Sequence, residues 1–253
     1  MNRLSRSFAL LSIGLGLAFC QAEPCRASAY HVSPVQVALS RRAPTALLTL
    51  QNDSRETLRF ELAAFEWNQS PRGEMQLAPT RDIVFFPTVI AISPGEERKV
   101  RVGASAGFGP VEKSYRLFFD ELPPLETVEG GVRQVRVLTQ MGIPIFFQPE
   151  KVVPQARLET VSLDKGFLSF SYRNSGNVHT TLRGIRVKGV GGAGETLFET
   201  EADGWYVLAG GSREYRIEVP KEYCPQAKHV VIEVRTDRET LSEHLDPSPD
   251  VCS

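Results

Sequence analysis

Short runs in which apolar and polar residues alternate recur along the whole chain, and they constrain the fold more than any other feature. In the first half they include VQVALS, TALLTLQN, LRFELAAFEW, RKVRVG and YRLFFDEL, and the polar segments NDSRET, NQSPRGE, SPGEE and GFGP separate them. A period of two residues is typical of a β-strand, whereas Asn, Asp, Gly, Pro and Ser gather in turns. No segment has the sustained periodicity of an amphipathic helix. We therefore predict an all-β fold, with roughly seven short strands in the first half forming a sandwich.

A second set of similar runs follows the segment QPEKVVPQ, which contains Pro149 and Pro154. This segment is too short to act as a flexible linker. We therefore predict two β-sandwich domains, at residues 30–150 and 151–253, set at a definite angle around a cleft.

The stretch VRQVRVLTQMGIPIFFQP, residues 132–149, alternates like a strand but is unusually long and apolar. Pro144 cannot donate to a sheet ladder, so it belongs on an edge strand or at a bulge. Long apolar edges promote aggregation, so the presence of one in this chain suggests that the edge has a function.

The N-terminus has the three parts of a secretory signal peptide. Arg3 and Arg6 are followed by the apolar segment FALLSIGLGLAF and the small residues of ASA, which predict a signal peptide at residues 1–29. A cut after Ala22 and a lipoprotein at Cys20 are the alternatives. No later segment reaches the length of about 20 apolar residues that a membrane span needs, so we expect a soluble, exported product without stable membrane insertion.

The mature chain would be nearly neutral. Cleavage removes three arginines and one glutamate from a chain with 29 Lys and Arg and 30 Asp and Glu, which leaves a net charge of −3. Without a long basic run, nucleic acid is not an expected partner. Cys20 and Cys25 leave with the signal. The remaining pair, Cys224 and Cys252, is predicted to form a disulfide in an oxidising compartment.

Patterns that would indicate catalysis, a cofactor or a metal are weak. Gly189, Gly191 and Gly194 have G-x-G-x-x-G spacing, but a strand-like run follows them, so a hairpin turn is the better interpretation. The histidines lack metal-ligand spacing and are interpreted as surface or turn residues: His31, His179, His229 and His244. The segment GASAG, residues 103–107, has G-x-S-x-G spacing, but the turn segment GFGP and no helical pattern follows it, so we expect no nucleophile elbow. We therefore expect no enzyme, no cofactor and no metal site.

Several stretches, in order, resemble the PapD-like periplasmic chaperones of chaperone–usher pilus assembly. They are VSPVQVALS, ALLTLQNDS, the block from AFEWNQSPRGE to RKVRVG, YRLFFDELPP, RVLTQMGIPIFFQP, RNSGNVHTTLRGIRV and WYVLAGGSREYRIEV. The IPIFF ending and the YRLFF strand are similar to those of the archaic, spore-coat-like branch of the family. The resemblance implies two immunoglobulin-like sandwiches, a periplasmic location, pilus subunits and an outer-membrane usher as partners, and donation of a strand to the subunit.

The resemblance also implies which residues contact the pilus subunit. The donor strand would present one face, formed by Val135, Val137, Thr139, Met141 and Ile143. The alternative is that this face belongs to the protein's own core.

Family members hold the subunit's C-terminal carboxylate with an arginine in the first strand and a lysine near the end of the seventh. The matching positions here are Gln36 and Pro144, which carry no charge. Arg116 is the best replacement, and its alternative is a solvated strand residue. Lys99 and Arg101 are interpreted as solvated edge residues.

Two other functions remain open at this point. One is a secreted structural or adhesive β-sandwich protein, which predicts aromatic residues on exposed loops. The other is a hydrolase whose site has no recognisable pattern.

Overall fold

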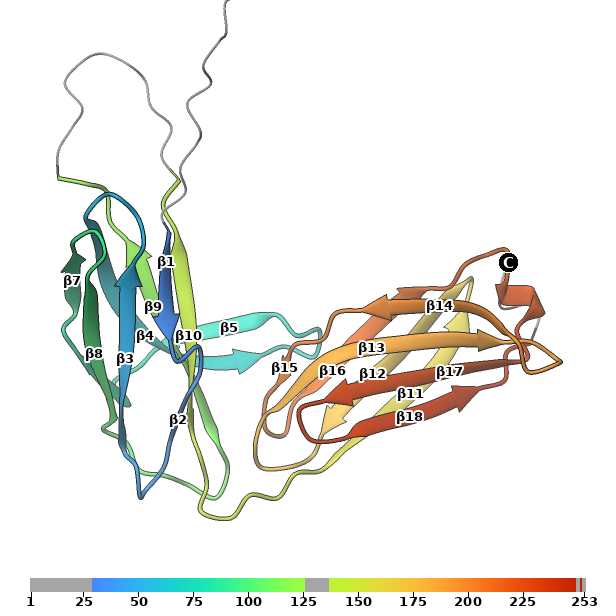
Figure 1. The fold of residues 1–253 in the computed structure, drawn as a ribbon. Helices are drawn as coiled ribbons and strands as arrows, with labels where there is room; N and C mark the ends of the chain where they lie inside the picture. The colour runs from blue at the N-terminus through green and yellow to red at the C-terminus, as the bar shows by residue number, and fades with distance from the viewer. Residues whose placement is uncertain (1–28, 126–136, 249–250, 252–253) are drawn as a thin grey trace, which may run out of the picture.

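The computed structural model describes residues 29–125, 137–248 and 251, and these residues form two all-β bodies (Figure 1). The all-β prediction is confirmed. The strands of the first body are β1 Tyr30–Ser33, β2 Val37–Leu39, β3 Thr45–Asn52, β4 Leu58–Gln69, β5 Met75–Pro79, β6 Ile83–Phe86, β7 Val89–Ile92, β8 Glu97–Ala104, β9 Lys113–Glu121 and β10 Gln140–Phe147. Those of the second are β11 Ala156–Asp164, β12 Phe167–Asn174, β13 Thr180–Val190, β14 Thr196–Ala202, β15 Tyr206–Val207, β16 Ser212–Glu218, β17 His229–Thr236 and β18 Thr240–Leu245, with a short 3₁₀ turn at Cys224–Gln226.

The first body is a sandwich of two sheets. One has the strand order β1-β3-β8-β6, and the other has the order β2-β10-β9-β4-β5, with β7 also paired to β4. Alternate residues of both sheets, among them Leu48, Phe60, Val100 and Leu117, form one continuous buried core. The described residues contain ten strands here rather than the predicted seven. The difference arises because β5, β7 and β10 were not among the runs that were counted.

The second body has a core of its own. Its sheets have the orders β11-β12-β16 and β14-β13-β17-β18, and β15 pairs with the start of β13. The glycine-rich segment 189–194 spans the end of β13 and the turn into β14, so its interpretation as a hairpin is confirmed. The two core clusters lie on either side of residue 150, where we predict the domain boundary.

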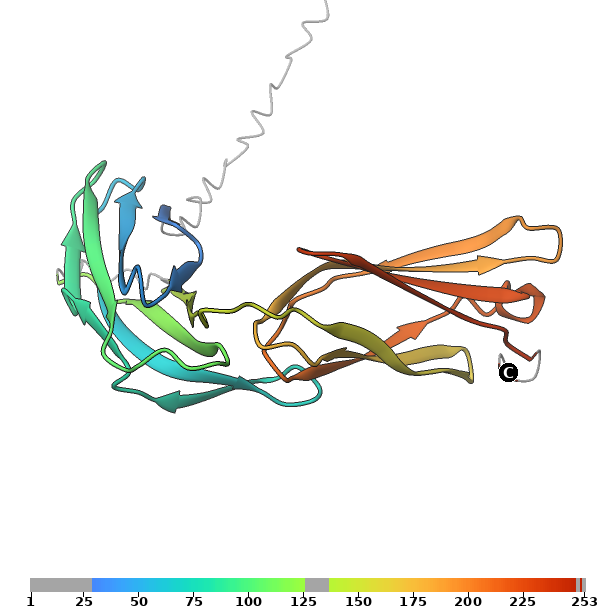
Figure 2. The same cartoon turned by 90° about the horizontal axis from the view of Figure 1, so that it is seen from below.

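The two bodies form a bent molecule in which the strands of one run across those of the other (Figures 1 and 2). The hairpin of β4 and β5 leaves the first body and reaches the second. At its turn, Pro71 O accepts a 3.0 Å hydrogen bond from Glu214 N of β16. Gly73 has a φ of +82°, and a Cβ there would lie 2.9 Å from the Arg213 guanidinium carbon. This turn therefore favours glycine for its backbone conformation, whereas the flexible Arg213 side chain can shift to admit a Cβ.

The cysteine prediction concerns the end of the chain. Cys224 is buried in the core of the second domain, and Cys252 lies outside the described residues. We expect a disulfide between them, because the loop that it would close typically adds about 3 kcal/mol to the free energy of unfolding. Mass spectrometry of the non-reduced exported protein should find neither cysteine alkylated. Two alkylated thiols in a folded sample would contradict the pairing.

Candidate functional site

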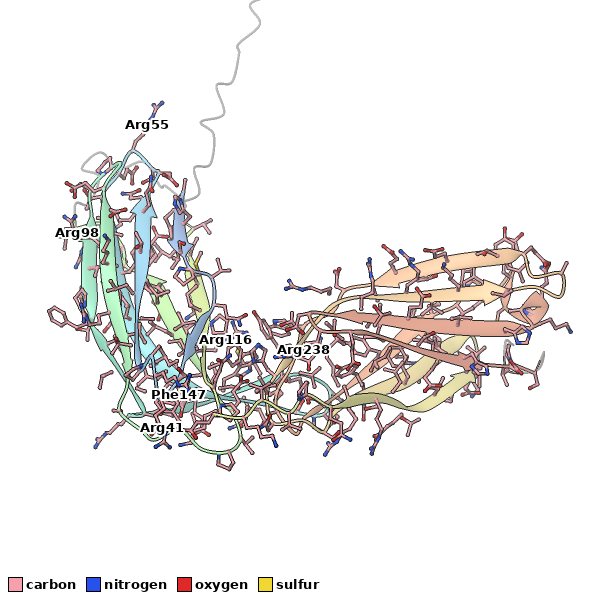
Figure 3. All side chains as sticks on the ribbon, turned by 60° about the horizontal axis from the view of Figure 1, so that its bottom comes forward. Arg41, Arg55, Arg98, Arg116, Phe147 and Arg238 are labelled. Atoms are coloured by element: carbon pink, nitrogen blue, oxygen red, sulfur yellow. The ribbon has the colours of Figure 1, made fainter. Side chains whose placement is uncertain are left out.

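Arg116 lies in β9 at the junction of the two domains (Figure 3). The residue is only 7% exposed. Its guanidinium carbon lies 3.9 Å from the centroid of the Trp67 ring, which belongs to β4 of the same sheet. The rings of Trp205 and Tyr206, from the second domain, lie 5.8 and 5.7 Å from the same carbon. Three aromatic rings from two domains therefore lie around one cation. The quadrupoles of these rings attract the positive charge of the guanidinium.

The hydrogen bonds of Arg116 satisfy only part of its guanidinium. Nη1 donates to the backbone oxygen of Gly142 in β10 at 3.1 Å. Nε and Nη2 are buried and have no hydrogen-bond partner among the described residues. Burial lowers the pKa of the Arg116 guanidinium, which nevertheless stays charged near neutral pH. The unpaired Nε and Nη2 form one edge of the fork, the edge that binds a carboxylate through two parallel hydrogen bonds.

Side chains of the first domain hold the segment that carries Trp205 and Tyr206. Gln69 donates to Tyr206 O at 3.0 Å and accepts from Leu208 N at 3.1 Å. The Tyr206 hydroxyl donates to Gln36 Oε1 at 3.1 Å. The segment with Trp205 and Tyr206 is thus hydrogen-bonded to two uncharged glutamines of the first domain. One of them, Gln36, occupies a position where the family resemblance predicts a cation.

A second contact between the domains was missed by the sequence analysis. His179, interpreted as a surface or turn residue, is 4% exposed. Glu112 Oε1 accepts hydrogen bonds from His179 N at 2.9 Å and from Nδ1 at 2.7 Å, and the imidazole stacks on Phe146 of β10 at 3.7 Å. The surface interpretation of His179 is wrong because its partners come from the other domain.

β10 contains the apolar stretch that was predicted to be donated. It pairs antiparallel with β9 along its whole length, but β2 pairs with it only from Ile145 to Phe147. The outer edge of residues 140–144 therefore has no partner among the described residues. Pro144 lies on this edge, directly opposite Arg116 in the β9 register, as the edge prediction required.

The predicted donor residues have different environments. Val135 lies outside the described residues, and Val137 and Thr139 precede β10, because β9 ends at Glu121 and offers no further partner. Val137 is 51% exposed, whereas Thr139 Oγ1 lies within hydrogen-bonding distance of Glu121 Oε2 and the Tyr30 hydroxyl. Met141 packs partly against the core of the first domain.

Ile143 is 2% exposed within that core. Its assignment to the donor face is therefore wrong, because it cannot enter another protein without leaving its own core. The part of the stretch that remains available is its exposed beginning.

Comparison with known proteins identifies the fold family. Residues 29–153 match the family model described as pili and flagellar-assembly chaperone, PapD N-terminal domain. The chain belongs to the PapD-like chaperone family. A search of curated proteins by sequence gives no match. Members of the PapD-like family are non-enzymatic, periplasmic pilus chaperones.

Solved structures resemble this PapD-like chaperone over most of their length. One is a complex of chaperone CsuC and tip adhesion subunit CsuE from archaic Csu pili of Acinetobacter baumannii, with 18% identity, a TM-score of 0.59 and coverage of 85% of this chain and 98% of that one. The YadV chaperone has 11% identity, a TM-score of 0.58 and coverage of 86% and 99%. A Salmonella enterica complex of SafA pilin and SafB chaperone has 12% identity, a TM-score of 0.55 and coverage of 88% and 98%. At these identities the likeness concerns the two-domain fold, and assignment to the archaic branch stays a prediction.

The other cations considered for this PapD-like chaperone lie away from the junction. Lys99 and Arg101 are both exposed. β6 pairs with β8 only from Arg101 to Ala104, so the edge interpretation is wrong for Arg101, whereas Lys99 lies on the part of β8 that β6 does not pair. A hollow of about 470 Å³ between the domains is lined by residues such as Phe108, Pro149 and Asn177 and does not include Arg116. Among the described residues, no group of acidic, histidine and cysteine side chains could hold a metal ion, and no helix is long and apolar enough to cross a membrane.

Trp67, Trp205 and Tyr206 are the site residues that the sequence analysis did not assign. The first lies in AFEW and the others in WYVLA, two motifs that carried the family resemblance, so the aromatic residues in these motifs were the available signal. The two tryptophan rings pack against each other, with 6.4 Å between centroids. This position between the domains differs from the exposed loops that an adhesive protein predicts.

Proposed function

We propose that this PapD-like chaperone binds pilus subunits in the periplasm, pairs with their open sheet edge through β10, anchors their C-terminal carboxylate at Arg116 and delivers them to an outer-membrane usher. The observation that carries the proposal is the unpaired Nε–Nη2 edge of a buried guanidinium. A buried cation without a counter-ion costs free energy, and a carboxylate supplies the charge and the two acceptors that are missing.

The place of this edge agrees with strand donation. A guest strand that pairs with the free edge of residues 140–144 must end near Pro144, because β2 occupies the edge from Ile145 onward. Pro144 lies opposite Arg116, whose guanidinium already reaches β10 at Gly142 O. The end of a guest chain and the cation therefore come together at the same level of the sheet.

Apolar groups next to this edge supply the other part of the interaction. Val137, on the predicted donor face, is exposed and lies just before β10. Burying such a side chain in a subunit whose sandwich lacks a strand is worth roughly 1.5–3 kcal/mol. This use explains why the chain keeps an apolar edge that would otherwise promote aggregation.

Binding requires one local movement. The two free nitrogens of Arg116 are buried, and Trp205 and Tyr206 cover them from the second domain. A carboxylate reaches the edge when these rings shift, which breaks the hydrogen bond that Tyr206 donates to Gln36 and those of Gln69 to the same segment but leaves both domain cores intact.

The test compares two peptides that differ only in their last group. One is a synthetic peptide of alternating valine and serine that ends in a free carboxylate, and the other ends in an amide. Isothermal titration with the exported protein should show that the free acid binds at least about tenfold tighter, since hydrogen bonds to charged groups exceed neutral ones by roughly 1 kcal/mol or more. Equal affinity for the two peptides would exclude a carboxylate anchor.

A further inference from the structure

The side chain of Trp67 carries a second buried donor without a partner. Trp67 is 1% exposed, and its indole Nε1 has no hydrogen-bond partner among the described residues. A buried tryptophan N–H is usually hydrogen-bonded, because burial removes its hydrogen bond to water and a missing replacement costs free energy. Stacking under Arg116 requires only the ring face. A phenylalanine would supply a ring face as well, so packing alone does not account for the N–H.

This donor belongs to the ring over which the Arg116 guanidinium carbon lies. The guanidinium carbon is 3.9 Å from the Trp67 ring centroid, and Nε1 is part of that ring. The other neighbours of the indole are aromatic: Phe146 at 6.1 Å, Trp205 at 6.4 Å and Tyr206 at 5.5 Å between centroids. None of these three rings gives the indole N–H an oxygen acceptor in the structure.

We propose that the Trp67 indole N–H donates a third hydrogen bond to the carboxylate held by Arg116. The inference rests on the proposed function and adds a binding residue to it. A carboxylate has two oxygens with about four acceptor positions, so it accepts the two bonds of the Arg116 edge and one more.

The combined site presents donors only, which determines what it selects. Its unpaired groups are Arg116 Nε, Arg116 Nη2 and Trp67 Nε1, and all three donate. In a terminal amide, an NH₂ group replaces one carboxylate oxygen. This NH₂ group is itself a donor, so it cannot accept a hydrogen bond from the site, and the same holds for a side-chain amide. The site therefore selects the ionised end of a polypeptide chain over neutral polar groups.

The experiment uses Trp67→Phe, which keeps a ring and removes the N–H, and Tyr215→Phe as its matched control. Tyr215 also carries a buried donor without a partner among the described residues, but its ring stacks on Phe170 of the second domain. With the valine–serine peptide that ends in a carboxylate, we expect Trp67→Phe to weaken binding about tenfold, the size of a lost hydrogen bond to a charged group. Binding of the amide peptide should not change, and Tyr215→Phe should bind the acid within about twofold of wild type. Acetate alone should not compete at concentrations near those of the peptide, because it lacks the strand that pairs with β10.

A second measurement does not depend on how well the variant folds. The chain has two tryptophans, so the ¹H–¹⁵N spectrum of the wild-type protein has two indole signals, and Trp205→Phe identifies the one from Trp67. That signal should move downfield on addition of the acid peptide and not of the amide. An unmoved Trp67 signal, or wild-type affinity in Trp67→Phe, would overturn the inference. If Arg116→Met abolishes binding of the acid in the same experiment, the proposed function stands without Trp67, and if neither variant affects binding, both fail.

Discussion

Replacing Arg116 by methionine should abolish anchoring of a chain end while leaving the protein as stable as before. Methionine keeps an unbranched side chain between Trp67 and Trp205 but removes the charge and the unpaired donors. Loss of one partner from a buried, hydrogen-bonded charge pair costs about 2–5 kcal/mol of binding. A buried cation without a counter-ion costs free energy in the empty protein, so its removal is neutral or stabilising. We therefore expect a melting temperature equal to or above that of wild type.

Arg101→Met is the control, because Arg101 is exposed on β8, away from the junction. Titration with the acid peptide and thermal melting should be carried out on both variants. Wild-type affinity in Arg116→Met would move the anchor elsewhere. A large drop in its melting temperature would show that the guanidinium contributes to the fold.

The second large effect separates two residues on the same face of one segment. Val137→Asp should leave the fold intact, because an exposed side chain outside a strand changes stability by about 0.5 kcal/mol or less. The charge should instead prevent the segment from entering an apolar groove, where the valine would contribute roughly 1.5–3 kcal/mol. Ile143→Asp places a carboxylate in the core and should cost about 4 kcal/mol or more of stability.

Circular dichroism melting and co-purification with co-expressed pilus subunits measure the two outcomes. The expected result is a folded Val137→Asp protein without subunits and an Ile143→Asp protein that fails to fold. Unfolding of Val137→Asp would show that the beginning of the segment also belongs to the core. Normal recovery of subunits with Val137→Asp would remove this segment from the binding surface.

The sandwich fold was predictable because several strands have one buried face. In β3 and β8, alternate residues such as Leu48, Leu50 and Val100 are in the core, so the period of two residues is present in the sequence itself. Pro144 similarly indicated an edge, because its missing N–H restricts it to a position without a partner.

The alternation of apolar residues did not predict where the stretch 137–143 changes from exposed to buried. Val137 and Ile143 are similar residues of the same parity, but their environments differ. Ile143 pairs with β9 and belongs to the core of the first domain, whereas Val137 precedes the part of the chain that β9 pairs with. Only the pairing of strands distant in sequence decides this difference.

Residues at the domain junction were predictable only in part. Arg116 could be proposed because the positions of the expected cations carry Gln36 and Pro144. Its partners could not, because Trp67, Gly142 and Tyr206 come from two other strands and from the second domain. The burial of His179 has the same cause, since Glu112 lies 67 residues earlier in the sequence.

The three residues of β2 have a consequence for the range of subunits that one chaperone can serve. Because β2 fills the edge of β10 from Ile145 onward, the proposed function implies that a guest is aligned from its last residue and not from any internal motif. Backbone pairing and a terminal carboxylate are common to all polypeptides, so such alignment is indifferent to most of the guest's sequence. Under the proposed function, a single chaperone therefore accommodates subunits of unrelated sequence, provided that each ends at the same distance from its open groove.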